Sequence, residues 1–439
     1  MTRILIKGAT IVPMTGPDQI IQNGEIAIEG DVIKAIGQAG TMGNSWPADK
    51  VIDGQGKLVI PGFINCHTHA AMTLFRSYAD DLPLMEWLQT KIWPVEENLI
   101  AEDIYWGTML SVAEMIKSGT TTFLDMYFHM DQVGKVAEET GIRAVLSRGM
   151  IGFGERARTA AREARELVAQ WHNKAEGRVT VMLGPHAPYT CPPDFLKEVK
   201  VLSQELGAGI HIHLAETLNE VNEITEKYGK RPIELMNEIG LLDGTHVVAA
   251  HCVHLTDEEI AIMAEKGVGV AHNPESNMKL ASGIAPVPKL LEKGVNVGLG
   301  TDGASSNNNL DMLQEMRSAA LVHKVNSMNA TVIPAYQALE MATAGGARVL
   351  GLDKEIGILQ PGYKADLLII DLEKPHLYPR HDVVANLVYS AQASDIDTVI
   401  INGKLVMENR QLLTMNEKAV LRKAQEHTDA LLARSKEKK

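Results

Sequence analysis

The chain has 439 residues, which is enough to bury a large core and to form more than one domain. A formal net charge of −13 argues against nucleic acid or an anionic membrane as a partner. No apolar run of about 18 residues is present, residues 1–12 lack the features of a signal peptide, and the three scattered cysteines are too few for a disulfide framework. We therefore expect a globular protein of the reducing cytoplasm, and the sequence leaves open a homo-oligomer.

Short strands and turns are expected at both ends of the chain. Residues 1 to about 57 contain apolar runs separated by Gly and Asp turn residues, and residues 364–370 and 398–403 repeat that pattern. We predict one composite β-sandwich domain from residues 1–57 and 358–415. Residues 416–439 are predicted to form a charged, exposed terminal helix whose lysine-rich end is solvated and has no partner.

The middle of the chain, residues 58–357, alternates short apolar runs with amphipathic helices. This alternation is typical of βα units and a parallel sheet. Eight such units predict an α/β fold, a (β/α)8 TIM-like barrel, which takes about 250 residues. The strand candidates are Leu58–Asn65, Thr121–Met126, Ala144–Arg148, Val179–Gly184, Gly209–Leu214, Val247–His251, Val268–His272 and Val295–Gly300.

Residues with metal-ligand chemistry follow several of these strands. His67 and His69 lie at positions i and i+2, so both side chains point to the same face of a strand and can hold one metal ion. Packing would explain a single His-x-His pair equally well. Several candidates at strand ends are stronger evidence, because the C-terminal ends of the strands in a barrel meet at one mouth. The sequence therefore predicts a barrel hydrolase with one metal ion. The other candidates at strand ends are His213, Glu216, His251 and Asp302.

Longer motifs make the sequence recognisable. The chain resembles the amidohydrolase superfamily in two runs and two single histidines. These are Pro-Gly-Phe-Ile-Asn-Cys-His-Thr-His at 61–69, His213, His251 and Gly-Thr-Asp-Gly at 300–303. The resemblance covers nearly the whole chain. Within the superfamily, local motifs resemble the bacterial methylthioadenosine/S-adenosylhomocysteine deaminases. These motifs lie at residues 81–96, 125–128, 184–189 and 272–277.

This resemblance implies hydrolytic deamination at C6 of adenosine-type thio-nucleosides. The expected reactions convert 5′-methylthioadenosine to 5′-methylthioinosine and S-adenosylhomocysteine to S-inosylhomocysteine, with release of ammonia. The expected partner is thus a small nucleoside substrate.

The resemblance also implies one divalent metal ion per chain. Three nitrogens and one carboxylate suit zinc, while iron or manganese could also fit. Two-metal relatives carry a carboxylated lysine at the end of strand four, but residues 179–184 contain no lysine, so we expect a mononuclear site. His211 shares a strand face with His213, and we interpret it as a packed, hydrogen-bonded histidine. The implied ligands are His67, His69, His213 and Asp302.

The expected catalyst is water activated by the metal, because a metal ion can lower the pKa of its bound water to about 7. Asp302 would take the proton of that water, and His251 would hydrogen-bond the attacking hydroxide. Glu216 lies three residues past His213, where its carboxyl group could protonate ring N1 as hydroxide attacks C6. Taken alone, Glu216 could be an acid at a helix N-terminus, but its distance from a ligand favours the catalytic role.

Besides Glu216, which would reach ring N1, three residues are expected to contact the nucleoside. In the family that the chain resembles, the position of Glu96 binds the ribose hydroxyls, and the position of Arg148 contacts the substrate tail, where a homocysteine carboxylate would lie. His186, at the end of strand four, would hydrogen-bond the purine or the ribose. The simpler alternatives are a surface acid for Glu96 and a structural ion pair for Arg148. His272, on strand seven, could act on the site indirectly.

Two other functions fit parts of the sequence. A guanine deaminase or a triazine-type chlorohydrolase could use the same scaffold, although Glu96 and the run 184–186 favour a nucleoside. A non-catalytic amidohydrolase-like binding protein would not be expected to keep the ligand set together with Glu216 and His251. Zinc deaminases of the cytidine type are excluded, because their H-x-E and P-C-x-x-C pattern has no counterpart here.

Overall fold

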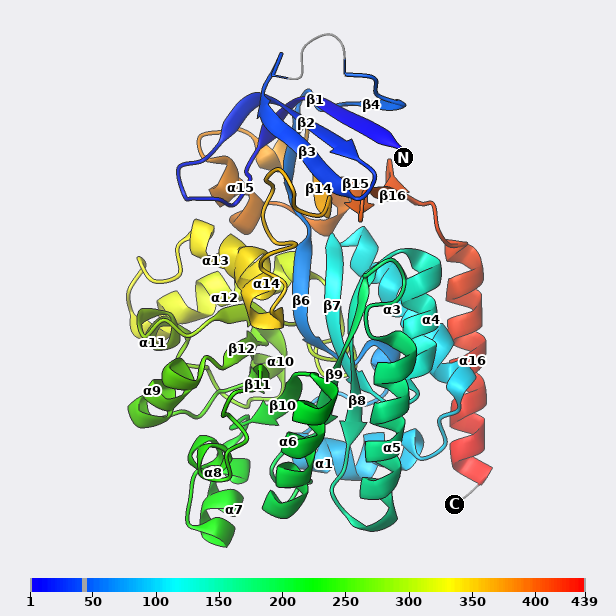
Figure 1. Cartoon of the computed structure of the whole chain (residues 1–439), viewed down its shortest axis with the longest axis vertical. Coiled ribbons are helices and arrows are strands. Elements are labelled where there is room, and N and C mark those ends of the chain that lie inside the picture. Colours follow the sequence, from blue (N-terminus) through cyan, green and yellow to red (C-terminus); the bar gives the residue numbers. More distant parts are fainter. Residues whose placement is uncertain (1, 42–45, 438–439) are drawn as a thin grey trace.

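The computed structural model describes residues 2–41 and 46–437, and the strands of these residues form two sheets. One sheet has nine strands drawn from both ends of the chain, and the other has eight parallel strands from its middle. In Figure 1 the nine-stranded sheet lies above the barrel, and the barrel strands run away from it. The predicted fold class, a (β/α)8 barrel with a β-domain built from both chain ends, is confirmed.

The nine-stranded sheet has the order β17-β16-β15-β14-β5-β1-β2-β3, with β4 paired to β1. β5 pairs parallel with β1 and antiparallel with β14, so it joins the N-terminal strands to the C-terminal ones. The strands of this sheet are β1 (Arg3–Ile11), β2 (Ile21–Glu29), β3 (Val32–Gln38), β4 (Lys50–Asp53), β5 (Lys57–Pro61), β14 (Leu367–Asp371), β15 (Ile396–Ile401), β16 (Lys404–Glu408) and β17 (Gln411–Leu412).

The barrel strands follow one another in chain order, from β6 to β13, and all neighbours are parallel. β13 also lies next to β6, so the barrel is nearly closed. Because the strands are buried on both faces, they read as nearly continuous apolar runs. They are β6 (Phe63–Thr68), β7 (Thr120–Tyr127), β8 (Arg143–Met150), β9 (Val179–Pro185), β10 (Ile210–Leu214), β11 (Val247–His251), β12 (Gly269–His272) and β13 (Val297–Leu299).

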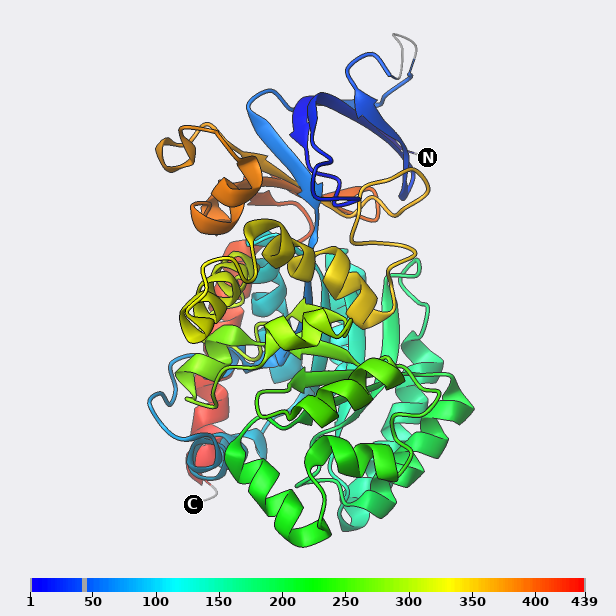
Figure 2. The same ribbon diagram turned by 90° about the vertical axis from the view of Figure 1, so that its left-hand side faces the viewer.

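Helices surround the barrel. Figures 1 and 2 show α13 and α14 between the barrel and the nine-stranded sheet. The helices are η1 (Ala70–Phe75), α1 (Leu84–Trp87), η2 (Leu88–Ile92), α2 (Trp93–Glu96), α3 (Ala101–Lys117), α4 (Met130–Thr140), α5 (Gly154–Trp171), α6 (Pro193–Leu206), α7 (Leu218–Tyr228), α8 (Pro232–Glu238), α9 (Asp257–Lys266), α10 (Pro274–Lys279), α11 (Val287–Glu292), α12 (Met312–Ser327), α13 (Ala335–Ala342), α14 (Ala344–Leu350), η3 (Pro375–Leu377), α15 (Val383–Tyr389), η4 (Ala393–Asp395) and α16 (Glu417–Glu437).

The first barrel strand differs from its prediction. The sequence predicts one strand over residues 58–65, but the structure has two, because β5 ends at Pro61 in the nine-stranded sheet and β6 begins at Phe63 in the barrel. Gly62 joins them where a side chain would not fit, since a Cβ atom there would lie 2.1 Å from Thr121 Oγ1. One apolar run is therefore shared between two sheets. The apolar pattern of the sequence does not show where the chain leaves the first sheet and enters the second.

A buried ion pair fixes the barrel to the nine-stranded sheet. Arg143, the first residue of β8, donates from Nε to Asp366 Oδ2 over 2.8 Å, and both side chains are buried. Asp366 also accepts the backbone N–H of Asn402 at 2.6 Å. Removing one partner would leave a buried charge uncompensated, so the contact holds the two sheets together. The domain limits at 1–57 with 358–415, and at 58–357, stay a prediction.

The predicted terminal helix is present as α16, and one of its faces packs against α3. Asp103 of α3 is fully buried there; its Oδ1 lies 2.8 Å from His427 Nδ1, and its Oδ2 pairs with Arg434. The helix is therefore docked along one side of the barrel, whereas its sequence pattern alone predicted an exposed helix.

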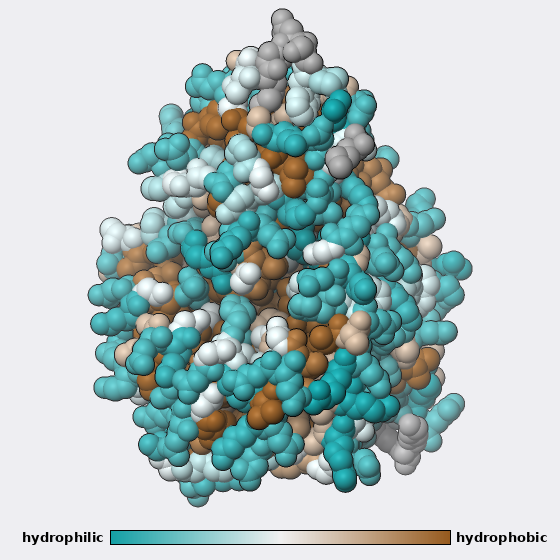
Figure 3. Space-filling model, viewed as in Figure 1, coloured by the Kyte–Doolittle hydropathy of each residue, from teal (hydrophilic) through white to brown (hydrophobic). Residues whose placement is uncertain are grey.

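The described part of the chain contains no helix that is both long and apolar enough to cross a membrane. The face of the molecule in Figure 3 is mainly hydrophilic, with apolar side chains gathered in small separate patches. The three cysteines, Cys66, Cys191 and Cys252, are buried and free.

Candidate metal centre and active site

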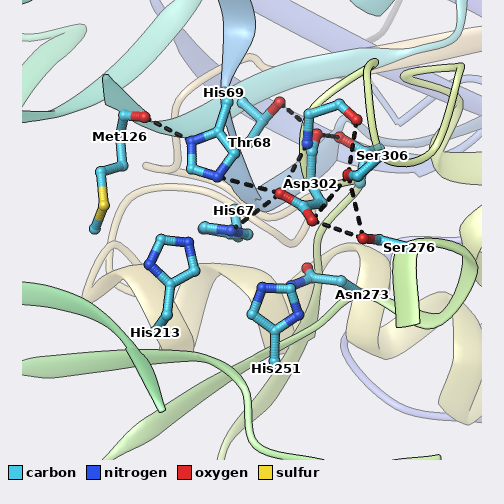
Figure 4. Close-up of polar contacts among 12 residues, drawn as sticks. His67, Thr68, His69, Met126, His213, His251, Asn273, Ser276, Asp302 and Ser306 are labelled. Carbon is cyan, nitrogen blue, oxygen red and sulfur yellow. Dashed lines mark hydrogen bonds and ion pairs between the residues drawn. The ribbon is translucent and has the colours of Figure 1, made fainter. Parts of the chain in front are cut away.

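Five side chains from four barrel strands meet at the C-terminal end of the barrel (Figure 4). Each comes from the end of its strand or from the residues directly after it, which is where a barrel of this kind builds its site. They are His67 and His69 at the end of β6, His213 in β10, His251 at the end of β11, and Asp302 after β13.

The chain turns sharply where it leaves three of the strands. Ala215, His251 and Asp302 have φ angles of 52°, 72° and 59°. Residues with a Cβ atom rarely adopt such angles, and they are concentrated at functional sites. The backbone is therefore bent at the points from which His251, Asp302 and the neighbouring Glu216 project.

The candidate ligand atoms surround one point. His67 Nε2 and His69 Nε2 lie 3.4 and 3.2 Å from the same oxygen, Asp302 Oδ1. Among the described residues, two overlapping groups have ligand atoms within 4.8 Å of one another: His67 with His213 and His251, and His67 with His69 and Asp302. The structure thus brings the four predicted ligands together with His251 beside them, while their roles stay a prediction.

Two of the imidazole rings are anchored by backbone carbonyls. His69 Nδ1 lies 2.6 Å from the carbonyl oxygen of Met126, and His213 Nδ1 lies 2.7 Å from that of His186. A carbonyl oxygen only accepts, so Nδ1 of each ring carries a proton, and in the neutral ring Nε2 keeps a free lone pair. Both rings are therefore held in the tautomer that can bind a metal through Nε2.

His67 provides a direct test of whether the cluster fits a metal ion. Its ring is fully buried, its Nδ1 lies 2.8 Å from His211 Nε2, and its Nε2 has no hydrogen-bond partner among the described residues. A buried nitrogen without a partner is costly, and a cation would satisfy it. Imidazole nitrogens with one carboxylate oxygen are the donors that a divalent ion such as zinc prefers. The residues present therefore fit one divalent metal.

Two of the candidate histidine ligands, His67 and His213, are uncharged at neutral pH. Burial lowers the pKa of His67 to about 3 and holds the pKa of His213 well below its usual range. Burial acts in the same direction on His69, but the hydrogen bond and the charge of Asp302 outweigh it and raise the pKa of His69 to about 9. Metal ligation needs neutral imidazole and ionised carboxylate, and His67 and His213 already meet that requirement.

Asp302 is held by two serine hydroxyls on the oxygen that faces away from the histidines. Ser276 Oγ donates to Asp302 Oδ2 over 2.6 Å, and Ser306 Oγ does so over 3.0 Å (Figure 4). Burial acts to raise the pKa of Asp302, but the contacts with His67 and His69 outweigh it, and the pKa lies well below its usual range. The carboxylate is thus ionised and fixed in orientation, with Oδ1 toward the cluster.

His251 lies between the cluster and Glu216. Its Nδ1 lies 2.9 Å from Asn277 Oδ1, and its Nε2 lies 3.8 Å from Glu216 Oε2. Glu216 also accepts a hydrogen bond from Ser282 Oγ at 3.3 Å. Burial raises the pKa of the Glu216 carboxyl, while His251 opposes that shift. A carboxyl group with a raised pKa keeps its proton closer to neutral pH and suits general acid catalysis.

Glu96 lies at the end of α2, and its partner comes from the barrel. Tyr127 Oη, at the end of β7, donates to Glu96 Oε1 over 2.5 Å. The Tyr127 ring lies 6.3 Å from the His69 ring, centroid to centroid, so Glu96 is close to the cluster. Burial raises the pKa of Glu96, and the Tyr127 hydroxyl opposes the shift. Its position therefore disfavours the alternative of an ordinary surface acid.

Arg148 forms an ion pair within the chain. Its Nε and Nη2 lie 2.8 and 2.7 Å from Glu163 Oε2 of α5, and its guanidinium lies over the Phe128 ring at 5.5 Å. Its Nη1 also donates to the carbonyl oxygen of Gly149. The side chain of Arg148 is 15% exposed and that of Glu163 is 39% exposed. The alternative of a structural ion pair is therefore realised, and any role in substrate binding would have to share the guanidinium with Glu163.

His186 follows β9 and lines the site beside His213. The two rings lie 4.9 Å apart, centroid to centroid, and His186 Nδ1 lies 2.9 Å from Thr190 Oγ1. Burial, followed by the nearby His69 and His251, lowers the pKa of His186 to about 4. A neutral imidazole is therefore available for a hydrogen bond. His272, by contrast, lies with its Nε2 3.1 Å from His323 Nε2 of α12.

Several residues that contact the site residues were assigned no role from the sequence. Ser276 and Asn277 belong to the run at 272–277 that supports the family resemblance, so their importance was signalled although their contacts were not. Tyr127 likewise belongs to the run at 125–128, whereas Glu163, Ser282 and Ser306 carry no pattern of their own in the sequence. The residues missed are Tyr127, Glu163, Ser276, Asn277, Ser282 and Ser306.

Comparisons with known proteins agree with this geometry. Residues 58–406 match the model of the amidohydrolase family. The chain is 57% identical over 432 residues to a 5-methylthioadenosine/S-adenosylhomocysteine deaminase of Syntrophomonas wolfei, which covers 98% of this chain and 100% of that protein.

Two solved structures are also similar to this one. An adenosine deaminase from Xanthomonas campestris with bound zinc has a TM-score of 0.95 and 36% identity, covering 98% of this chain and 99% of that one. The guanine deaminase of E. coli has a TM-score of 0.82 and 25% identity, covering 93% of this chain and 100% of that one. Since the family model spans most of the chain and the relatives extend over nearly all of it, this chain belongs to the amidohydrolase family.

Proposed function

We propose that this protein is a metal-dependent hydrolase that removes the C6 amino group of adenosine-type thio-nucleosides. Its substrates are 5′-methylthioadenosine and S-adenosylhomocysteine, and its products are the corresponding inosine derivatives and ammonia. The observation that carries the choice of substrate is the 57% identity, over nearly the full chain, to a protein named for this reaction. The chemistry is supported by a buried carboxyl group, Glu216, beside a cluster that fits one divalent metal.

His67, His69, His213 and Asp302 would hold the metal ion, and zinc is favoured because the similar adenosine deaminase carries it. When bound, such an ion lowers the pKa of a water molecule to about 7 and so provides hydroxide at neutral pH. β9 offers no lysine for a bridging ligand, so the proposal is for one ion per chain.

Three residues would move or hold protons during attack on C6. Asp302, ionised and fixed by its two serines, takes the proton that the attacking water releases. His251 hydrogen-bonds the attacking oxygen, since its Nε2 lies between the cluster and Glu216. Glu216 donates its proton to ring N1, which makes C6 a better electrophile. When the C6–N bond breaks, the proton held by Asp302 leaves with the amino group as ammonia. The proton of the new C6 hydroxyl passes to Glu216 as the carbonyl forms, which restores the acid, and N1 keeps the proton that it received.

The nucleoside would be recognised by residues around the metal cluster. Glu96, held by Tyr127, accepts hydrogen bonds from the two ribose hydroxyls. His186 contributes a hydrogen bond from a neutral ring, and Arg148 contacts the substrate tail. We further propose that the protein acts in the cytoplasm on small molecules, without nucleic acid or membrane, since its net charge is −13 and its cysteines are free.

The experiment that tests this proposal measures ammonia release by the purified protein with its metal content determined in parallel. The substrates are adenosine, 5′-methylthioadenosine, S-adenosylhomocysteine, guanine and a chlorotriazine. We expect turnover of the two thio-nucleosides, with about one metal ion per chain as a mononuclear site requires. Turnover of guanine or the triazine alone would keep the barrel and the metal but reject the roles of Glu96, Arg148 and His186.

A further inference from the structure

Glu220 is a buried acid that none of the steps above uses. It lies in the first turn of α7, four residues after Glu216, and only 5% of its surface is exposed. Both of its carboxylate oxygens are taken by backbone amides. Oε1 accepts the N–H of Ala215 at 2.8 Å, and Oε2 accepts the N–H of Glu216 at 2.9 Å. One side chain therefore accepts hydrogen bonds from two successive backbone amides at the end of β10.

Helix capping does not explain this contact. At the start of α9, Glu259 accepts the N–H of Thr256, the residue that caps the helix, at 3.0 Å, and this is the ordinary arrangement for an acid three residues after a cap. In α7 the cap is Thr217, whose hydroxyl accepts the Glu220 N–H at 3.1 Å. Glu220, however, reaches past Thr217 to the two residues before it.

The peptide groups that Glu220 holds belong to a turn with a backbone conformation that is unfavourable for residues with a Cβ atom. Ala215 has a φ angle of 52°, in the left-handed region. Its carbonyl oxygen accepts the N–H groups of Val253 and His254, both at 3.0 Å, in the segment that follows His251. The same turn thus sets the direction of Glu216 and ties it to the segment beyond His251.

We propose that Glu220 is a positioning residue, whose carboxylate holds the strained turn at Ala215 so that Glu216 points at the reacting nucleoside. This role rests on the proposed function in so far as Glu216 is the proton donor. Burial raises the pKa of Glu220, and the N–H groups of Glu216 and Ala215 oppose that shift, because they stabilise the ionised form in which both oxygens accept. A proton donor that is misplaced by about 1 Å can cost on the order of 100-fold in rate.

The first test is Glu220→Gln, measured with 5′-methylthioadenosine. Glutamine has one acceptor oxygen, and its NH2 group would face an amide N–H, so one of the two contacts becomes repulsive. We expect kcat to fall about 10- to 100-fold, KM to change by less than about threefold, and the metal content to stay at one ion per chain. Glu226→Gln is the control, because Glu226 lies exposed on the same helix. A kcat equal to that of the control, or a loss of metal that matches the loss of kcat, would overturn the role of Glu220.

A rescue separates positioning from general support of the fold. Glycine adopts positive φ angles freely, so Ala215→Gly should reduce the need for Glu220. We expect the double variant Ala215→Gly/Glu220→Gln to recover several-fold in kcat over Glu220→Gln, and no recovery would count against the strained turn. If Glu220→Gln does not fold, Glu220→Asp keeps the buried charge but is one methylene too short for both amides. It should then show the same selective loss of kcat, and a wild-type kcat would reject the role.

A measurement without substrate keeps this inference separate from the proposed function. Hydrogen exchange in a peptide covering Ala215 and Glu216 reports directly on the two amides that Glu220 holds. We expect exchange to be about tenfold faster or more in Glu220→Gln than in the wild type, and unchanged in Glu226→Gln. Unchanged exchange would overturn the role of Glu220 whatever the substrate is. Faster exchange with no turnover of any nucleoside would instead reject the proposed function.

Discussion

The two halves of the barrel mouth are built differently. On the side of the proposed metal ligands, called here the metal side, carbonyl oxygens anchor His69 and His213 through Nδ1, so Nε2 of each ring stays toward the centre. Two serines hold Asp302 Oδ2, and Oδ1, toward the centre, accepts the backbone N–H of Gly303 at 2.8 Å. On the side of the proposed substrate contacts, called here the substrate side, Glu96 and Arg148 have their charged atoms engaged by other side chains of the chain itself. The metal side is therefore preorganised, while the substrate side has contacts that a ligand must share or displace.

This difference predicts which quantities mutations will change. Losing a group from the preorganised side should reduce kcat or metal affinity, because nothing else can take its place. Changing a group on the substrate side should alter KM and the ranking of substrates, since those groups exchange one partner for another.

The largest expected effect is that of Asp302→Asn. The asparagine amide cannot take a proton from the attacking water. Its NH2 group would also replace one of the two carboxylate oxygens, either the one that would bind the metal or the one that accepts from the two serines. We expect kcat for 5′-methylthioadenosine to fall on the order of 10³-fold, with an unchanged circular dichroism spectrum. An activity near that of the wild type would reject the proposed proton route.

The next effect concerns His211, whose Nε2 lies 2.8 Å from Nδ1 of His67 on the metal side. Replacing His211 by Phe removes the partner of His67 Nδ1 and leaves that buried nitrogen without a hydrogen bond. Partners of metal-binding histidines typically contribute about 10- to 100-fold to metal affinity. We expect a loss of that size in the metal dissociation constant, measured by competition with a chelator. His323→Phe, which changes a buried histidine beside His272, is the control and should leave the constant unchanged.

The sequence was sufficient to bring the residues of the metal side together, because position along a strand decides where they lie. His67, His69, His213 and His251 fall at the ends of apolar runs, and parallel strands of a barrel bring those ends together. The predicted and observed limits of β11 even coincide at Val247–His251. The first strand was the exception, since the run at 58–65 is shared between two sheets.

The contacts of the substrate side could not be read in the same way. The partner of Glu96 is Tyr127, which lies 31 residues away on a different element, and the partner of Arg148 is Glu163 on the following helix. No periodicity connects these pairs, because each depends on how a loop or helix packs over the mouth. The positive φ angle at Ala215 is similarly invisible, since alanine does not signal a left-handed turn.

A smaller effect is expected for Glu96→Gln, which replaces the proposed acceptor of the ribose hydroxyls. Hydrogen bonds to charged groups contribute about 1.5–3 kcal/mol, so KM for 5′-methylthioadenosine should rise by roughly 10- to 100-fold. The 2′,3′-dideoxy analogue lacks both hydroxyls and should be turned over with a similar KM by the wild type and the variant. An equal rise in KM for both compounds would remove Glu96 from ribose recognition.

Tyr127→Phe sharpens the same comparison. The variant keeps the ring beside His69 but removes the hydroxyl that holds Glu96, so the carboxylate remains available and only its position is loosened. We expect a rise in KM of a few-fold at most, in line with the loss of one hydrogen bond, and again only for the substrate that has ribose hydroxyls. A larger effect than that of Glu96→Gln would mean that Tyr127 contacts the nucleoside itself.

The smallest expected effect concerns the pair Arg148 and Glu163. Changing one or the other should shift the preference between the two substrates in opposite directions. Arg148→Ala should reduce kcat/KM for S-adenosylhomocysteine more than for 5′-methylthioadenosine, because only the former has a tail carboxylate. Glu163→Gln should do the reverse, since it frees the guanidinium from a partly exposed partner, and such pairs are worth about 0.2–1 kcal/mol. We therefore expect the ratio of the two kcat/KM values to move only a few-fold, down in one variant and up in the other. If both variants change the two substrates equally, Arg148 acts only as a structural ion pair and the tail is recognised elsewhere.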